Sequence, residues 1–162
     1  MCAIYSPNAM NKPNDIELLL LRSKVKKPFE LQVAGTSMLP VLRHGDTVTV
    51  CRKDDYEVGD ILVFIYKNGE VLVHRLLAVE NGRFFCKGDN SFRVEDIDAG
   101  HIVGAVMLEH DQHRGVDFIA ASRAVGRAFR RCGYDITKTI STHEYQTYRQ
   151  KYLENTHEIH KE

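Results

Sequence analysis

The hydrophobic and polar positions of the chain change their spacing twice. Between residues 29 and 108, short apolar runs are separated by turn residues, which is typical of β-strands. The predicted strands are 29–34, 47–50, 61–66, 71–79, 83–87 and 102–108. Asn-Gly pairs at 68–69 and 81–82 predict hairpin turns between neighbouring strands.

On either side of this β-rich part the spacing is helical. Asn14 followed by Glu17 is typical of a helix start, and this short helix is expected to end before Pro28. After residue 114, apolar residues recur at helical spacing up to Gly133. A further helix is expected to begin at Ser141.

Together these patterns predict a mainly β (α+β) fold with a short N-terminal helix and C-terminal helices. The expected division is a tail and short helix at 1–28, a β domain at 29–110 and a helical extension at 111–162.

The composition excludes several classes of protein. The 162 residues carry 22 basic and 22 acidic side chains, so no excess of basic charge indicates nucleic-acid binding. The longest apolar run, 61–66, is too short to span a bilayer, which takes about 20 residues. Four cysteines without a C-x-x-C pair do not indicate a disulfide scaffold. We therefore expect a soluble, cytoplasmic protein that does not bind nucleic acid.

The candidate chemistry centres on a serine and a histidine. Ser37 follows a predicted strand and Gly35, and Pro40 keeps that strand from continuing, so the hydroxyl is expected at an exposed turn. A serine there can attack a carbonyl carbon if a base takes its proton, and backbone N–H groups of the turn can hold the oxyanion. His74, inside the apolar run 71–77, is the candidate base.

Both residues also have a purely structural interpretation. A serine after glycine is a common turn former, and a histidine in an apolar strand is commonly a hydrogen-bonded core residue. Asp89, Asp96 and Asp98 are nearby acids that could orient the His74 imidazole. The local pattern alone therefore leaves a serine hydrolase as one option among several.

Several short motifs follow one another in a specific order along residues 31–108. They are Gly35-Thr36-Ser37-Met38-Leu39-Pro40 with Gly45-Asp46, Gly59-Asp60 with the strand after it, Val73-His74-Arg75, Lys87-Gly88-Asp89-Asn90 and Ile102-Val103-Gly104. This set resembles the signal peptidase I family of S24/S26 serine peptidases. Bacterial members usually have Lys-Arg where this chain has His74-Arg75, so the chain resembles the histidine-type branch of the endoplasmic reticulum, archaea and some Gram-positive bacteria.

The resemblance implies a fold and a role for individual residues. The fold would be the coiled β fold shared by signal peptidases and LexA-like repressors. Ser37 would be the nucleophile, with its backbone N–H in the oxyanion hole, and His74 the general base. An aspartate after the Gly-Asp-Asn motif would complete a triad; Asp96 is expected in that role, with Asp98 as an alternative and Asp89 as a structural residue. The residues expected to shape the turn and support the site are Gly35, Met38, Pro40 and Asp89.

The implied partner is a peptide or protein substrate, an extended leader or precursor segment bound as an added strand. Unlike ordinary signal peptidases, the protein is expected to lack a membrane anchor. The self-cleaving domains of phage and SOS repressors are also soluble, but they use a lysine base. The alternative function is a peptide-binding or regulatory module of the same fold with weak or no catalysis. No cofactor is expected.

Two further features have competing interpretations. The arginine-bearing segment 114–131 either packs its apolar face on the β core or lies against an anionic membrane surface. The latter would place the protein at the periphery of the inner membrane surface. The pairs His110/His113 and His157/His160 lack the further ligands that a metal ion needs, so no metal site is expected.

Overall fold

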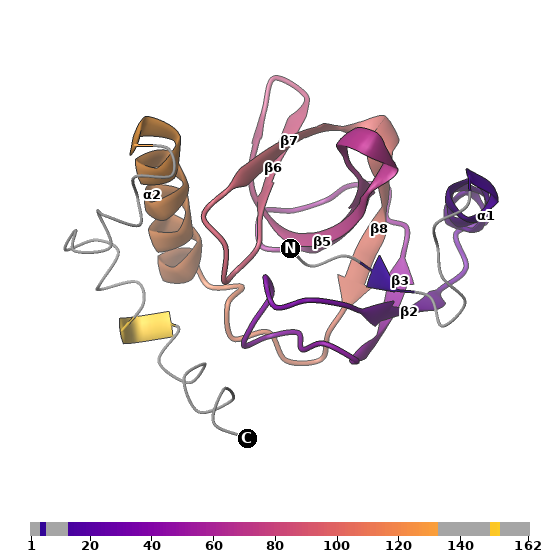
Figure 1. Ribbon diagram of the computed structural model, residues 1–162, viewed down its shortest axis with the longest axis horizontal. Coiled ribbons are helices and arrows are strands. Elements are labelled where there is room, and N and C mark those ends of the chain that lie inside the picture. Colours follow the sequence, from indigo (N-terminus) through magenta and orange to yellow (C-terminus); the bar gives the residue numbers. More distant parts are fainter. Residues whose placement is uncertain (1–3, 6–12, 133–149, 153–162) are drawn as a thin grey trace.

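The computed structural model describes residues 4–5, 13–132 and 150–152. Within them, eight strands form one antiparallel sheet in the order β1-β2-β3-β8-β4-β5-β6-β7 (Figure 1). The strands are β1 (Ile4–Tyr5), β2 (Phe29–Val33), β3 (Thr47–Cys51), β4 (Ile61–Ile65), β5 (Val71–Glu80), β6 (Arg83–Lys87), β7 (Val94–Asp98) and β8 (Ile102–Met107). Residues 13–132 also form the helices α1 (Pro13–Lys24) and α2 (Val116–Cys132) and the 3₁₀ helices η1 (Lys67–Gly69) and η2 (Ala99–His101). The mainly β (α+β) fold expected from the sequence is confirmed.

The sheet is curved rather than flat. The pairing of β4 with β8 shifts register between Val63 and Phe64, and that of β5 with β6 shifts between Leu76 and Ala78. Such bulges bend a strand and increase its local twist. The strands β5 to β8 accordingly curl around one another, with β2 and β3 beside them (Figure 1).

Strand β5 runs through the centre of the sheet and is buried on both faces. All of residues 71–78 are buried. Val73 packs in the cluster formed with the first strands, whereas Leu72 packs in a second cluster on the other side. Polar side chains at such positions must find partners within the protein, because burial without a hydrogen bond is costly. His74 and Arg75 are the two charged or polar residues of this buried stretch.

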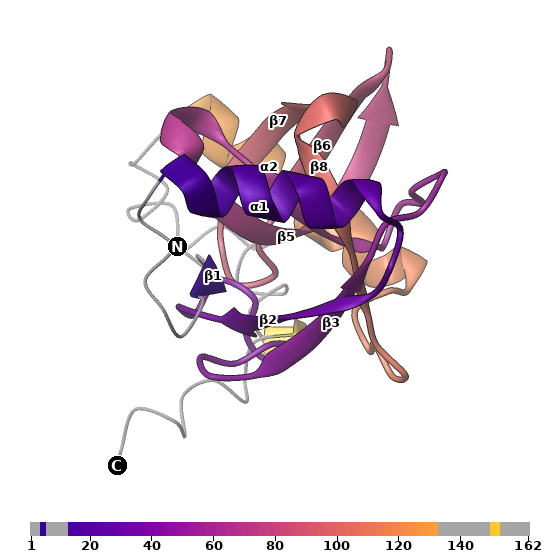
Figure 2. The same ribbon diagram turned by 90° about the vertical axis from the view of Figure 1, so that its right-hand side faces the viewer.

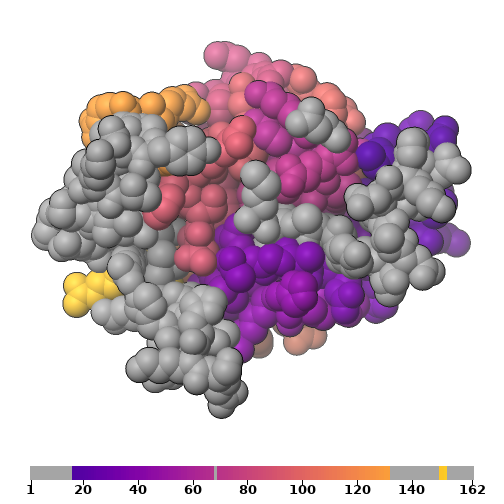
Figure 3. Space-filling model, viewed as in Figure 1, coloured from indigo at the N-terminus to yellow at the C-terminus, as the bar shows by residue number. Residues whose placement is uncertain are grey.

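The two α-helices lie on opposite sides of the sheet (Figure 1, Figure 2). Helix α1 buries Leu19 in the cluster of the first strands, and α2 buries Phe118 and Val125 against Leu77 of β5. In the space-filling view, the first strands and the central strands meet along a common border, with α2 at the edge of the molecule (Figure 3). No helix among the described residues is long and apolar enough to cross a membrane.

Every predicted strand is present, and its ends agree with the structure to within one residue. Helix α1 begins at Pro13, so Asn14 lies in its first turn rather than at its cap, and proline suits the first helical position. Two strands were not predicted: β1, a two-residue strand within the expected N-terminal tail, and β7, whose three acidic residues hide the strand pattern. The helix expected from Ser141 and the pair His157/His160 lie outside the described residues.

Candidate active site

Ser37 lies in the loop that joins β2 to β3. The loop is bounded by Gly35 and Gly45, whose φ angles of +89° and +91° fall in the left-handed region that favours glycine. Between them, Met38 and Leu42 are buried and anchor the loop in the core. Ser37 itself is only 5% exposed, so the prediction of an exposed turn serine was wrong. The anchoring side chains on either side draw the loop into the protein.

The side chain of His74 reaches Ser37 from the centre of the sheet. His74 lies on β5, is 2% exposed and is 37 residues from Ser37 in the chain. The Oγ atom of Ser37 and the Nε2 atom of His74 are 2.8 Å apart, a hydrogen-bond distance. The structure thus brings together the two residues that the sequence analysis singled out as nucleophile and base.

The acid behind His74 is Glu95 of β7. Its Oε2 atom lies 2.8 Å from Nδ1 of His74, and both side chains are buried. A carboxylate only accepts hydrogen bonds, so the bonded Nδ1 atom carries a proton and donates it. In the neutral imidazole, Nε2 is then the acceptor for the hydroxyl of Ser37. We refer to Ser37, His74 and Glu95 as the relay.

Asp96, expected in this role from the sequence, does not contact His74. Along β7 Glu95 is buried, whereas Asp96 and Asp98 are exposed. Nε of Arg83 donates to Oδ1 of Asp96 at 2.7 Å, and Nη1 of the same arginine donates to Asp98. The expectation was wrong by one residue, because successive side chains of a strand point to opposite faces.

The loop after β6 closes one side of the relay. The backbone N–H of Asn90 donates to the carbonyl oxygen of Ser37 at 2.7 Å, and Nδ2 of Asn90 donates to that of Thr36 at 3.1 Å. A Cβ atom at Gly88 would lie 2.6 Å from the carbonyl oxygen of Ser37 and 3.1 Å from Nε2 of His74. Glycine is therefore required at residue 88 for the two loops to approach.

Asp89 anchors this loop through buried ion pairs. Its two oxygens accept hydrogen bonds from Nε and Nη2 of Arg75, both at 2.8 Å, and Nδ1 of His113 donates to it at 3.1 Å. Arg75 also donates to both oxygens of Asp111, at 2.7 and 2.9 Å. Burial alone would raise the pKa of Asp89, but the hydrogen bonds from His113 and Arg75 outweigh it and hold that pKa below its ordinary value. Asp89 thus lies where it can support the loop but does not contact the imidazole of His74.

Lys87 is a second buried cation beside the relay. Its Nζ atom donates to the carbonyl oxygens of Gly88 and Ser91, at 2.9 and 2.6 Å. Burial lowers the pKa of this ammonium group to about 8, although the carboxylates of Asp89 and Glu95 oppose the shift. Sequence reasoning did not single out this lysine beyond its place in a motif.

The remaining predicted residues lie around the Ser37 loop. The backbone N–H of Gly35 donates to Nδ1 of His44 at 3.2 Å, and Pro40 follows a cis peptide bond. His113, considered above for metal binding, is bonded to Asp89. Within the described part of the chain, no three His, Cys, Asp or Glu side chains converge to hold a metal ion.

The relay has a definite chemical capability. A hydroxyl faces an imidazole nitrogen that can accept its proton, and a carboxylate holds the other ring nitrogen in the required tautomer. This is the arrangement that activates a serine for attack on a carbonyl carbon.

Comparison with known proteins identifies one family. The sequence model described as Peptidase S24-like matches residues 8–107, which include all of the relay. No curated protein and no solved structure matches the chain.

Proposed function

Because the chain belongs to the Peptidase S24-like family, we propose that it is a serine endopeptidase with Ser37 as nucleophile and His74 as general base. The observation that carries the proposal is the relay, in which both hydrogen bonds measure 2.8 Å. Glu95 takes the part that the sequence analysis gave to Asp96. It orients the imidazole and stabilises the positive charge that forms when His74 takes up a proton.

The proposed reaction has two stages. Oγ of Ser37 attacks the carbonyl carbon of a peptide bond while its proton passes to Nε2 of His74. The C–N bond then breaks, His74 gives the proton to the leaving amine, and an acyl group remains on Ser37. In the second stage His74 takes a proton from water and the resulting hydroxide attacks the acyl carbon. The bond between that carbon and Oγ of Ser37 then breaks, the acid product leaves, and His74 returns its proton to Oγ. The backbone N–H of Ser37 is our proposed oxyanion donor.

We assign the protein, within this proposal, to the histidine-type branch of signal-peptidase-like enzymes. The residues in favour are His74-Arg75, where bacterial signal peptidases usually have Lys-Arg. The proposed substrate is an extended leader or precursor segment, met in the cytoplasm or at the inner membrane surface. A histidine base predicts that the rate of peptide cleavage falls as the pH is lowered, because a protonated imidazole accepts no further proton.

The burial of the relay favours a second candidate function. With Ser37 5% exposed, a substrate must enter past the side chains packed around the hydroxyl. A module that binds peptides by strand addition needs no such access. A peptide-binding or regulatory module with weak or no catalysis is therefore the alternative that the first experiment must separate.

That experiment exposes a peptide library, prepared by digesting a bacterial proteome, to the full chain and reads new peptide ends by mass spectrometry. The wild type is expected to create new ends, and Ser37→Ala and His74→Ala are expected to reduce their rate of formation by about 10⁴-fold. His110→Ala, at an exposed histidine outside the relay, is the matched control and should leave the rate unchanged.

Two outcomes would contradict the proposal. If the Ser37→Ala variant still cleaves peptides as the wild type does, the nucleophile is a group other than Ser37. Peptides retained by the wild type on native mass spectrometry, with no new ends formed, favour the binding module.

A further inference from the structure

A pocket lies between α2 and the strands β5 to β7, apart from the relay. Its cavity measures about 240 Å³, and its floor is apolar. The apolar residues that line it are Leu77, Ala78, Phe85 and Val94, and the charged ones are Glu80, Arg123, Arg127 and Arg130. We call it the arginine pocket. Pockets for whole small molecules measure about 300–1,000 Å³, so this one suits one or two side chains.

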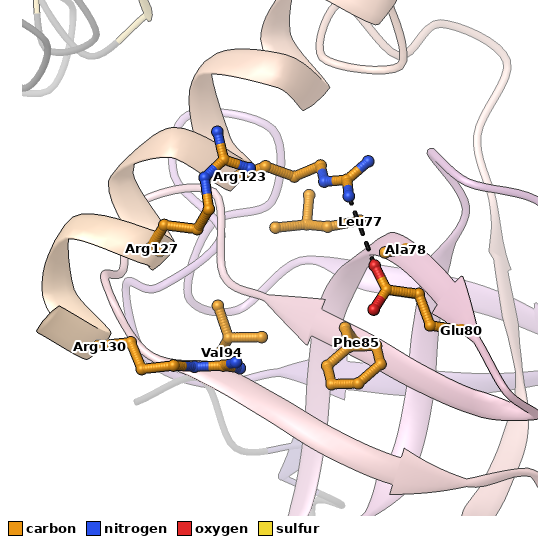
Figure 4. A pocket seen from close by; sticks show the side chains of 9 residues that line it. Leu77, Ala78, Glu80, Phe85, Val94, Arg123, Arg127 and Arg130 are labelled. Atoms are coloured by element: carbon orange, nitrogen blue, oxygen red, sulfur yellow. Dashed lines mark ion pairs between the residues drawn. The ribbon is translucent and has the colours of Figure 1, made fainter.

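The charges of the arginine pocket are unbalanced. Arg123 reaches from α2 over Leu77 to Glu80, where the closest N and O atoms are 3.5 Å apart (Figure 4). Arg130 extends from the same helix past Val94 (Figure 4). The side chains of Arg127 and Arg130 form no ion pair or hydrogen bond with any residue that the structure describes. Arg127 and Arg130 thus line the pocket as exposed side chains, and neither guanidinium group has a protein acceptor among the described residues.

Helix stability does not account for this cluster. A positive charge in the last turn, such as Arg130, interacts favourably with the helix dipole. Arg123 and Arg127, however, are four positions apart on one face, and like charges at that spacing destabilise a helix. Arg131 gives the last turn its basic charge without lining the pocket. With Arg123 paired to Glu80, the pocket keeps an excess of positive charge from Arg127 and Arg130, which suits a ligand that supplies negative charge.

The pocket lies close to the relay along the chain. Leu77 and Ala78 follow His74 on β5 by three and four residues, and Val94 directly precedes Glu95 on β7. At about 3.3 Å per residue, the strand distance from His74 to the pocket is about 10–13 Å. Val94 and Glu95 are successive residues, however, so their side chains point to opposite faces of β7, and the pocket and the relay lie on opposite sides of this strand.

From these observations we infer that the arginine pocket binds a carboxylate carried on an apolar peptide segment. Guanidinium groups bind carboxylates with paired hydrogen bonds, and the apolar floor suits the adjoining hydrocarbon. The inference goes beyond the proposed function, because the pocket lies on the opposite side of β7 from the relay. The carboxylate belongs to an acidic side chain or to the end of a peptide, and the test distinguishes the two.

The test uses the ¹⁵N-labelled full chain with Ser37→Ala, so that no probe is cleaved. The probes are N-acetyl-leucyl-glutamate methylamide, its glutamine counterpart, and N-acetyl-leucyl-leucine with a free C-terminal carboxylate. NMR follows the Nε–Hε signals of the arginines, assigned from their loss in Arg127→Gln and Arg130→Gln. A charged hydrogen bond contributes enough to make the glutamate probe bind about tenfold tighter than the glutamine probe.

Binding of the glutamate probe with shifts of the Arg127 and Arg130 signals supports an acidic side chain, and tighter binding of the free carboxylate supports a peptide end. The double variant Arg127→Gln/Arg130→Gln should lose the preference, whereas Arg131→Gln, matched in charge and helix position, should keep it. Equal binding of charged and neutral probes overturns the inference. So does a response of these signals to phosphatidylserine vesicles alone, which would assign the arginines to a membrane surface.

The cleavage experiment and the probe-binding experiment distinguish failure of the proposed function from failure of the arginine-pocket inference. If only the proposed function fails, the wild type forms no Ser37-dependent cleavage products, while the preference for the charged probe in the Ser37→Ala chain remains. If only the arginine-pocket inference fails, cleavage persists and the probes bind equally.

Discussion

The Nδ1 atom of His74 lies 2.8 Å from the Oε2 atom of Glu95, and both side chains are almost fully buried. In a buried pair of this kind, the carboxylate decides which ring nitrogen carries the proton. It leaves the Nε2 atom of His74 free of a proton and directed at the hydroxyl of Ser37. The proposed mechanism therefore depends on Glu95 as much as on His74.

Glu95→Gln tests this dependence. The amide can donate to Nδ1 and favour the wrong tautomer, so we expect kcat to fall by roughly 10²–10⁴-fold with the fold retained. Steady-state kinetics on a cleaved peptide measures the effect, and circular dichroism checks the fold. The matched control is Asp96→Asn, one residue away at an exposed pair with Arg83, which should leave kcat unchanged. Equal losses in the two variants would contradict the assignment of Glu95.

Gly88→Ala tests the close approach of the two loops. The added Cβ would lie 2.6 Å from the carbonyl oxygen of Ser37, so either loop must move. We expect a loss of about 1–3 kcal/mol in the free energy of unfolding and a lower kcat, because the movement separates Ser37 from His74. Gly100→Ala is the control, since a Cβ there meets nothing within 4 Å. A Gly88→Ala protein as stable and active as this control would show that the contact is not needed.

Arg75→Gln tests the ion pairs that hold the Asp89 loop. Removing the guanidinium leaves the buried carboxylate of Asp89 without its main partner, so unfolding should become easier by about 3–5 kcal/mol. Denaturant titration measures this loss. Arg83→Gln removes an arginine that also binds two carboxylates, but at the surface, and should cost no more than about 1 kcal/mol. The prediction fails if the two substitutions cost the same.

Lys87→Met tests the buried ammonium group. Its pKa is about 8 in the folded protein against 10.5 in an unfolded chain, so between these values the unfolded chain binds more protons. The free energy of unfolding of the wild type should therefore rise relative to that of Lys87→Met as the pH increases from about 8 to 10.5. The change over this range is about 3 kcal/mol.

Unfolding curves in denaturant at a series of pH values measure the Lys87 effect. Lys24→Met, at an exposed position of α1, is the control and should follow the wild type throughout. Stability curves of wild type and Lys87→Met that stay parallel across the range would disprove the effect.

The strands were predictable because each leaves a local signal. Apolar runs such as 61–65 and the Asn-Gly turns record which residues are buried and where the chain reverses. There are two exceptions. Strand β1 has only two residues, too few to show an alternating pattern. Strand β7 carries a buried acid at Glu95, so its inward-facing residues do not look alike. Ile97, two positions later and also buried, was the one sign that Glu95 faces inward.

Local pattern was sufficient to identify a β-rich domain and its flanking helices, because burial and turn formation act on neighbouring residues. It made Ser37 and His74 candidates, and the order of the short motifs along the chain gave them their expected roles. The partner of His74, the burial of Ser37 and the arginine pocket depend on segments far apart in the chain. The relay joins three separate segments, and a one-residue change of register in β7 would have placed Asp96 inward instead of Glu95. Strand pairing across the whole sheet decides that register, and so decides which acid supports the histidine.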